Sequence, residues 1–124
     1  MNKPYGQELI LDLHDCDNTT FNRKSIDGYF ESLCNAIAMV KCERFWWDDV
    51  GLPIEEHQTE PHTKGTSAVQ FILTSSIVIH TLDLMNAVYI NIFSCKPFDY
   101  SIAEKLTIDW FKAKHSITHQ ITRT

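Results

Sequence analysis

The sequence has no uninterrupted apolar run that approaches the ~20 residues of a membrane-spanning helix. Its first residues, MNKPYGQE, also lack the apolar core of a signal peptide. Both absences argue against a membrane protein and against a secreted one. We expect a protein that stays in the cytoplasm and makes no contact with a membrane.

Positive charge is scarce and scattered along the chain. There are 11 Lys and Arg residues against 16 Asp and Glu, which gives a formal net charge of −5. Proteins that bind nucleic acid usually gather basic side chains to contact phosphates, so we expect no nucleic-acid partner. An acidic protein is instead compatible with a cationic substrate.

Cysteine and glycine are also few. The four cysteines show no CxxC pairing and are too sparse for a disulfide scaffold, so we interpret them as free thiols. The four glycines form no phosphate-binding loop. His115 and His119 stand four apart, and His57, Glu60 and His62 share one loop, but neither set belongs to a recognised metal-binding motif. We therefore expect no metal site.

Apolar patterning predicts six strands in what we interpret as a single domain of residues 1–124. Residues 49–64, with two prolines and no sustained period, predict a long loop. The predicted strands are Gln7–His14, Cys42–Asp48, Ser67–Thr74, Ile77–Leu82, Ala87–Ser94 and a short final one around residues 117–121.

Two helices are predicted from apolar residues that recur every three or four positions. The first has Ser25 as its N-cap and runs to about Lys41. The second begins at a capping box of Ser101 and Glu104 and ends near His115. The two apolar stripes are Ile26, Tyr29, Phe30, Leu33, Ile37 and Val40 in the first helix, and Ile102, Leu106 and Trp110 in the second.

The order of these elements predicts the fold class. Runs of consecutive strands with only two helices favour an α+β fold, and we expect a two-layer sandwich whose mostly antiparallel sheet has both helices packed on one face. The other face of such a sheet is left available for a partner.

Four reactive side chains lie within the apolar stretch from Gly65 to Cys95: Ser67, Ser75, His80 and Cys95. Each alone has an ordinary structural explanation, since serines favour hairpin turns and single cysteines and histidines are often buried in cores. Their joint occurrence in a segment with few polar groups makes them the candidates for a functional site.

The same stretch resembles the bacterial S-adenosylmethionine decarboxylases, small pyruvoyl-dependent enzymes of polyamine and spermidine biosynthesis. Their pattern runs Gly-Val-Ser-Gly-Val, Glu-Ser-His, Ile-His-Thr-Trp-Pro-Glu and Phe-Thr-Cys. It aligns without gaps with GTSAV (65–69), TSS (74–76), IHTLDL (79–84) and FSC (93–95). The resemblance also reaches back to Leu9–Asp17, where the family has a first strand that ends in a similar Cys-Asp, and it extends weakly forward through the last predicted helix. It is poor across residues 43–64.

The resemblance implies that the chain is a zymogen that makes its own cofactor. Ser75 would cleave the Thr74–Ser75 bond autocatalytically and become a pyruvoyl group, which forms a Schiff base with the substrate amine and replaces pyridoxal phosphate. Ser67 and His80 would assist this processing, His80 as an acid and base. Cys95 would donate a proton during decarboxylation. Family members of this size are homodimers with active sites near the subunit interface.

Two departures from the family pattern lie beside the scissile bond. Thr74 stands where the family has Glu, and Ser76 stands where it has His. These changes leave open an alternative, in which the chain is an unprocessed, non-catalytic homologue that acts as a regulatory subunit.

Two further departures concern the substrate. Leu82 and Leu84 replace a Trp and a Glu that contact the nucleoside in the family, and leucine can neither stack on adenine nor accept a hydrogen bond. Ornithine or arginine is therefore an alternative to S-adenosylmethionine. Asp83 or Glu60, or the loop acids Glu55 and Glu56, would then pair with the distal cation.

Overall fold

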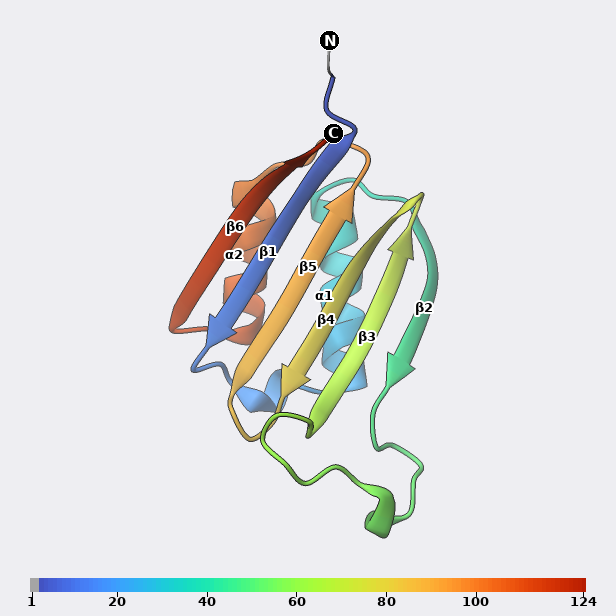
Figure 1. Ribbon diagram of the computed structural model, residues 1–124, viewed down its shortest axis with the longest axis vertical. Coiled ribbons are helices and arrows are strands. Elements are labelled where there is room, and N and C mark those ends of the chain that lie inside the picture. The colour runs from blue at the N-terminus through green and yellow to red at the C-terminus, as the bar shows by residue number, and fades with distance from the viewer. Residues whose placement is uncertain (1–2) are drawn as a thin grey trace.

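The computed structural model describes residues 3–124 as a six-stranded sheet with two helices on one face (Figure 1). The strand order is β2-β3-β4-β5-β1-β6, and every neighbouring pair is antiparallel. The predicted α+β two-layer sandwich is thereby confirmed. The elements are β1 (Gly6–His14), α1 (Arg23–Ala36), β2 (Lys41–Trp47), β3 (Gly65–Ile72), β4 (Ser75–Leu82), β5 (Ala87–Ser94), α2 (Tyr100–Phe111) and β6 (His115–Arg123).

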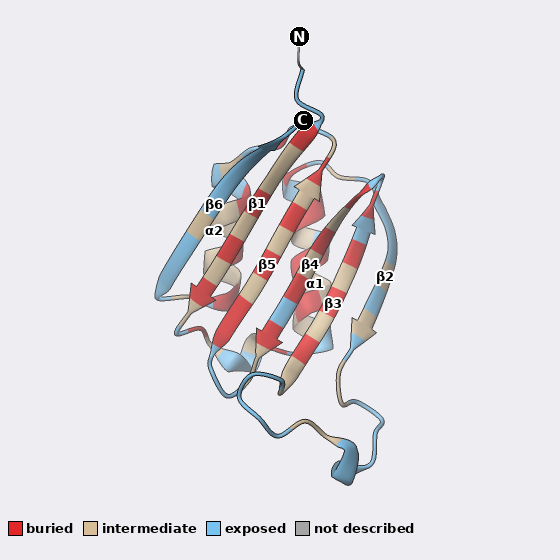
Figure 2. Ribbon diagram, viewed as in Figure 1, coloured by how far each residue is buried: buried red, intermediate tan, exposed pale blue. Residues whose placement is uncertain are grey.

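The core lies between the sheet and the two helices. Side chains alternate between the two faces of each strand, so that Leu9 and Leu11 of β1 and Ile77 and Ile79 of β4 point at the helices and are fully buried. Figure 2 shows this alternation as successive buried and less buried residues along the central strands. In the described part of the chain, neither helix is long and apolar enough to cross a membrane.

The hairpin between β3 and β4 differs from its prediction in one important detail. The tight turn consists of Leu73 and Thr74, because Ile72 and Ser75 close the ladder as a pair. Ser75 is therefore the first residue of β4 and is buried, although the predicted strands Ser67–Thr74 and Ile77–Leu82 left it between them. The bounds predicted for the next strand, Ala87–Ser94, are confirmed by β5.

Helix α1 begins and ends earlier than predicted. Asn22, in an extended conformation, is the N-cap and accepts a hydrogen bond from the backbone N–H of Ser25 at 2.9 Å, so Ser25 lies inside the first turn. The helix ends at Ala36, and Ala38 adopts a left-handed φ of 56°. Val40, predicted to belong to the apolar stripe, is consequently outside the helix and 61% exposed.

Helix α2 is capped by Asp99 and not by the predicted box of Ser101 and Glu104. The Asp99 carboxylate accepts hydrogen bonds from the N–H groups of Ser101 and Ile102. The helix ends at Phe111 and not near His115. Its buried residues are Ala103, Thr107 and Phe111, one position beyond the stripe predicted at Ile102, Leu106 and Trp110.

The sheet face opposite the helices is not covered by any of residues 3–124 (Figure 1). Large apolar side chains on it are substantially exposed, among them Phe45 (55%), Trp47 (58%) and Ile117 (55%). Trp46 points the other way and packs against Phe30 at the edge of the core. An uncovered apolar sheet face of this kind indicates an interaction surface.

Candidate functional site

The candidate site begins at the turn between β3 and β4. Thr74 has a left-handed φ of 57°, and both turn residues are exposed. The next residue, Ser75, is 8% exposed and turns its side chain toward the helix layer, as do Ile77 and Ile79 further along β4. The peptide bond between Thr74 and Ser75 therefore links an exposed residue in the left-handed conformation to the first residue of a regular strand.

Ser75 and Cys95 lie together although they are 20 residues apart in the sequence. The start of β4 pairs with the end of β5, where Ser76 lies opposite Phe93. As a result, the backbone N–H of Cys95 donates a hydrogen bond of 2.9 Å to the Ser75 hydroxyl oxygen. The Cys95 thiol lies 3.7 Å from the carbonyl oxygen of Leu73. One hydroxyl, one thiol and the turn thus form a single cluster at this end of the sheet.

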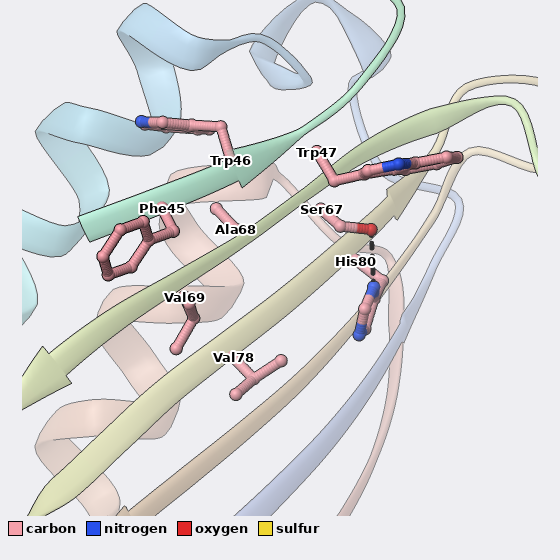
Figure 3. A pocket seen from close by; sticks show the side chains of 8 residues that line it. All are labelled: Phe45, Trp46, Trp47, Ser67, Ala68, Val69, Val78 and His80. Atoms are coloured by element: carbon pink, nitrogen blue, oxygen red, sulfur yellow. Dashed lines mark hydrogen bonds between the residues drawn. The ribbon is translucent and has the colours of Figure 1, made fainter.

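Ser67 and His80 form a second pair, which is brought together by the register of the same hairpin. They stand directly opposite each other in the β3–β4 ladder, and the Ser67 hydroxyl lies 2.7 Å from Nδ1 of His80. Both side chains point to the open face of the sheet, beside Trp47 (Figure 3). Gly65, two residues before Ser67, passes so close to the carbonyl group of Thr81 that any side chain there would collide with it.

The two clusters are far apart within one chain. Five residues separate Ser75 from His80 along β4, which corresponds to about 17 Å of strand. Their side chains also leave opposite faces of the sheet, because their positions differ by an odd number. His80 therefore cannot assist processing at Ser75 of its own subunit, the role that the family resemblance implies for it.

Separate surface hollows adjoin the two clusters. Ser67 and His80 line a hollow of about 280 Å³ (Figure 3), and one of about 440 Å³ borders the Thr74–Ser75 bond. The first is lined by Phe45, Trp46, Trp47, Ser67, Ala68, Val69, Val78 and His80. The second is lined by Cys42, Phe71, Ile72, Thr74, Ser75, Ser76 and Phe93.

Sequence reasoning did not place Cys42, Phe71 or Phe93 beside the scissile bond. The pairing of Ser76 with both Phe71 and Phe93 puts these rings on the open face next to the turn. The alternation of side chains along β3 and β5, the two neighbours of β4, was the sequence signal that could have located the two rings.

Asp83 and Glu60, the candidates for binding a substrate cation, differ in their surroundings. Asp83 follows β4 at the His80 end, and its Oδ1 is buried without a hydrogen-bond partner in the described part of the chain. Burial raises the pKa of the Asp83 carboxyl, while the nearby Lys64 ammonium acts in the opposite direction. Glu60 is exposed. Leu82 lines a hollow next to His80, whereas Leu84 is 59% exposed.

The remaining histidines do not assemble into a larger site. The Nε2 atom of His115 lies 3.4 Å from the carboxylate of Asp15, and His119 stands opposite Ile10 in the β1–β6 ladder. Within residues 3–124, no group of three or more His, Cys, Asp or Glu side chains is arranged to hold a metal ion.

These observations first define a class: a small α+β protein with a buried serine hydroxyl directly after a tight hairpin turn and a cysteine thiol beside that turn. The comparisons with known proteins then give the family. A family model described as S-adenosylmethionine decarboxylase matches residues 7–124, so the chain belongs to that family and is an S-adenosylmethionine decarboxylase-like protein.

A solved structure shares the fold. The crystal structure of the adenosylmethionine decarboxylase from Aquifex aeolicus VF5 matches with a TM-score of 0.78 and 18% sequence identity, over 98% of this chain and 92% of that one. No curated protein sequence matches the chain.

Proposed function

We propose that this chain is the precursor of a pyruvoyl-dependent α-decarboxylase of polyamine biosynthesis, which cleaves itself between Thr74 and Ser75. The observation that carries the proposal is the position of the Ser75 hydroxyl. It directly follows the exposed Thr74 peptide, and the Cys95 N–H holds its oxygen at 2.9 Å. A hydroxyl that is held in place next to the peptide bond it would attack suits an acyl shift, because the nucleophile is already ordered.

The chemistry of maturation can be assigned to these residues. The Ser75 Oγ atom attacks the Thr74 carbonyl carbon, the C–N bond breaks, and the released amine takes up the hydroxyl proton, which leaves an ester. A base then removes the Ser75 Cα proton, and the Cβ–O bond breaks so that Thr74 leaves as a carboxylate. Water finally replaces the nitrogen on the new chain end and releases ammonia.

The residues present fit the group that this sequence of steps produces. Ser75 becomes the first residue of the second chain, and the Cys95 thiol, 3.7 Å from the Leu73 carbonyl oxygen, lies at the same end of the sheet. The pyruvoyl ketone would supply the electron sink for loss of carbon dioxide from an amine-bearing amino acid. We assign Cys95 the role of donating a proton to the substrate carbon.

The base for maturation comes, in this proposal, from a second copy of the chain. Ser67 and His80 cannot reach Ser75 of their own subunit, which lies about 17 Å away along the strand. The open sheet face exposes aromatic side chains to solvent, and an exposed apolar surface of this kind favours association with a partner. A homodimer with the two open faces stacked about 10 Å apart would cover it.

Symmetry selects one arrangement of such a dimer. A two-fold axis parallel to the strands keeps the strand direction, so it would place the Ser67–His80 pair of one subunit over the same pair of the other. An axis in the interface and perpendicular to the strands keeps β4 over β4 but reverses its direction. The Ser67–His80 pair of one subunit then lies over the open face of its partner at the Thr74–Ser75 end, close to Phe71 and Phe93 of that partner. From this side the base would face the backbone at Ser75, where the Cα proton is removed, and not the buried hydroxyl.

For the substrate, S-adenosylmethionine follows from the family and is our first candidate. One observation favours ornithine or arginine as a second candidate. Asp83 keeps a buried carboxylate oxygen without a partner in the described residues, and it lies between two leucines that can neither stack on adenine nor accept a hydrogen bond. The distal ammonium or guanidinium group of ornithine or arginine would donate a hydrogen bond to that oxygen and pair with its charge.

The mass of the denatured protein tests self-cleavage. We expect two fragments, residues 1–74 and a pyruvoyl-blocked piece of residues 75–124. Ser75→Ala should give one intact chain without decarboxylase activity, while the matched control Ser76→Ala should still cleave. An intact wild-type chain after prolonged incubation would favour the alternative of a non-catalytic regulatory homologue.

Two further experiments separate the parts of the proposal. Mixing the Ser75→Ala chain with a His80→Ala chain should restore cleavage of the latter if the sites are shared between subunits, and no restoration would exclude sharing. Cys95→Ala should cleave but turn over poorly, in contrast to Cys42→Ala. Release of carbon dioxide from S-adenosylmethionine, ornithine and arginine, compared directly, identifies the substrate.

A further inference from the structure

Two hairpins of the sheet place a left-handed residue in their turns, and the two residues suit that conformation very differently. Asn86, with a φ of 50°, lies between β4 and β5, and Thr74, with a φ of 57°, lies between β3 and β4. Asparagine tolerates this region well, whereas a β-branched residue there is an outlier because its Cβ substituents crowd the backbone. A turn of this kind usually takes Gly or Asn at the position of Thr74.

The surrounding structure prevents Thr74 from relaxing. Ile72 and Ser75 close the turn as a ladder pair. The Leu73 N–H donates a hydrogen bond of 3.1 Å to the carbonyl oxygen of Val40, so the turn is also tied to the segment before β2. Cys95 holds the Ser75 hydroxyl from the other side. Strain at such a position persists only when its neighbours fix it in this way.

From this geometry, and resting on the proposed function, we propose that backbone strain at Thr74 drives self-cleavage of the bond that follows it. When the Oγ–C bond forms and the C–N bond breaks, two atoms, Oγ and Cβ, link the Thr74 carbonyl carbon to Ser75 Cα in place of the single amide nitrogen. The turn becomes one atom longer, and Thr74 can leave the left-handed region. Strain present in the precursor is lost on the way to the ester, which lowers the barrier.

The test is the rate of cleavage of the full-length chain after cell-free synthesis, followed by denatured mass. Thr74→Asn and Thr74→Gly accept the left-handed conformation and should slow cleavage about fivefold. Thr74→Val keeps the β-branch and removes the hydroxyl, so it should cleave at the wild-type rate. Equal rates for wild type and Thr74→Asn, or a Thr74→Val variant as slow as Thr74→Asn, would overturn the proposal.

A control at the other hairpin distinguishes local strain from general loosening of the sheet. Asn86→Thr introduces the same conflict between β4 and β5 and should lower the urea midpoint of unfolding without changing the cleavage rate. A change in the cleavage rate of this variant would count against the proposal. If the wild-type chain is never cleaved, the proposed function fails together with the strain, whereas cleavage at one rate in all variants removes the strain alone.

Discussion

A buried hydrogen bond between the two helices allows a prediction whose sign depends on which group donates. The Tyr29 hydroxyl of α1 lies 2.7 Å from Oγ1 of Thr107 in α2, and both side chains are fully buried. Thr107 Oγ1 also lies 2.7 Å from the carbonyl oxygen of Ala103, which can only accept. Thr107 therefore donates to Ala103, and Tyr29 donates to Thr107. Burial raises the pKa of Tyr29, which keeps the phenol protonated for this role.

Because of this assignment, removing the Thr107 hydroxyl and removing the Tyr29 hydroxyl should lower the free energy of unfolding by different amounts. Thr107→Val preserves shape but leaves the buried Tyr29 O–H without an acceptor, and it should lower the free energy of unfolding by about 1 to 3 kcal/mol. Tyr29→Phe leaves Thr107 with its bond to Ala103 and should cost about 1 kcal/mol or less. The double variant contains no unpaired donor, so it should be no less stable than Thr107→Val alone.

Urea unfolding of the four proteins in the uncleavable Ser75→Ala background measures these differences on one uniform chain, provided that the slope with urea is the same for all. Strictly additive losses in the double variant would contradict the reasoning. A larger loss for Tyr29→Phe than for Thr107→Val would show that the donor assignment is wrong.

Two further predictions follow from charges and thiols. Arg23 makes two hydrogen bonds of 2.7 Å to Asp48, which lowers the pKa of that carboxyl. The stabilisation is therefore present above the ordinary pKa of Asp and is lost as pH falls through the lower folded value. Arg23→Gln should cost about 1 kcal/mol at pH 7 in urea unfolding and progressively less toward pH 3, and a pH-independent loss would contradict this. Burial raises the pKa values of Cys16 and Cys34 to about 11, so iodoacetamide at pH 8 should modify exposed Cys42 first and these two only after denaturation; labelling of either at the rate of Cys42 would be inconsistent with their burial.

Sequence patterns predicted the strands and the layer order well because two-residue periodicity survives wherever one face is buried. They were less reliable at helix ends. Asn22 and Asp99 cap the helices with side chains that look no different in sequence from other turn residues. In α2 the pattern also missed by one position, since Thr107 is buried through its hydrogen bond to Tyr29 and Trp110 is only partly covered.

For the candidate site, the sequence supplied the residues but not their distances. The spacing of Ser67, Ser75, His80 and Cys95 identified the family resemblance, yet Ser75 and His80 lie five residues apart on one strand, β4, and on opposite faces of the sheet. The rise of a strand over five residues could have given this separation. The contact between Ser75 and the Cys95 N–H depends on the β4–β5 register, which no local pattern contains.

The hairpin turn at Leu73 and Thr74 fixes both clusters at once. A two-residue turn that closes on the Ile72–Ser75 pair determines every later pair in the ladder, including Ser67 with His80 at the far end. The strained bond in one subunit and the proposed base that reaches it from the other thus depend on the same turn.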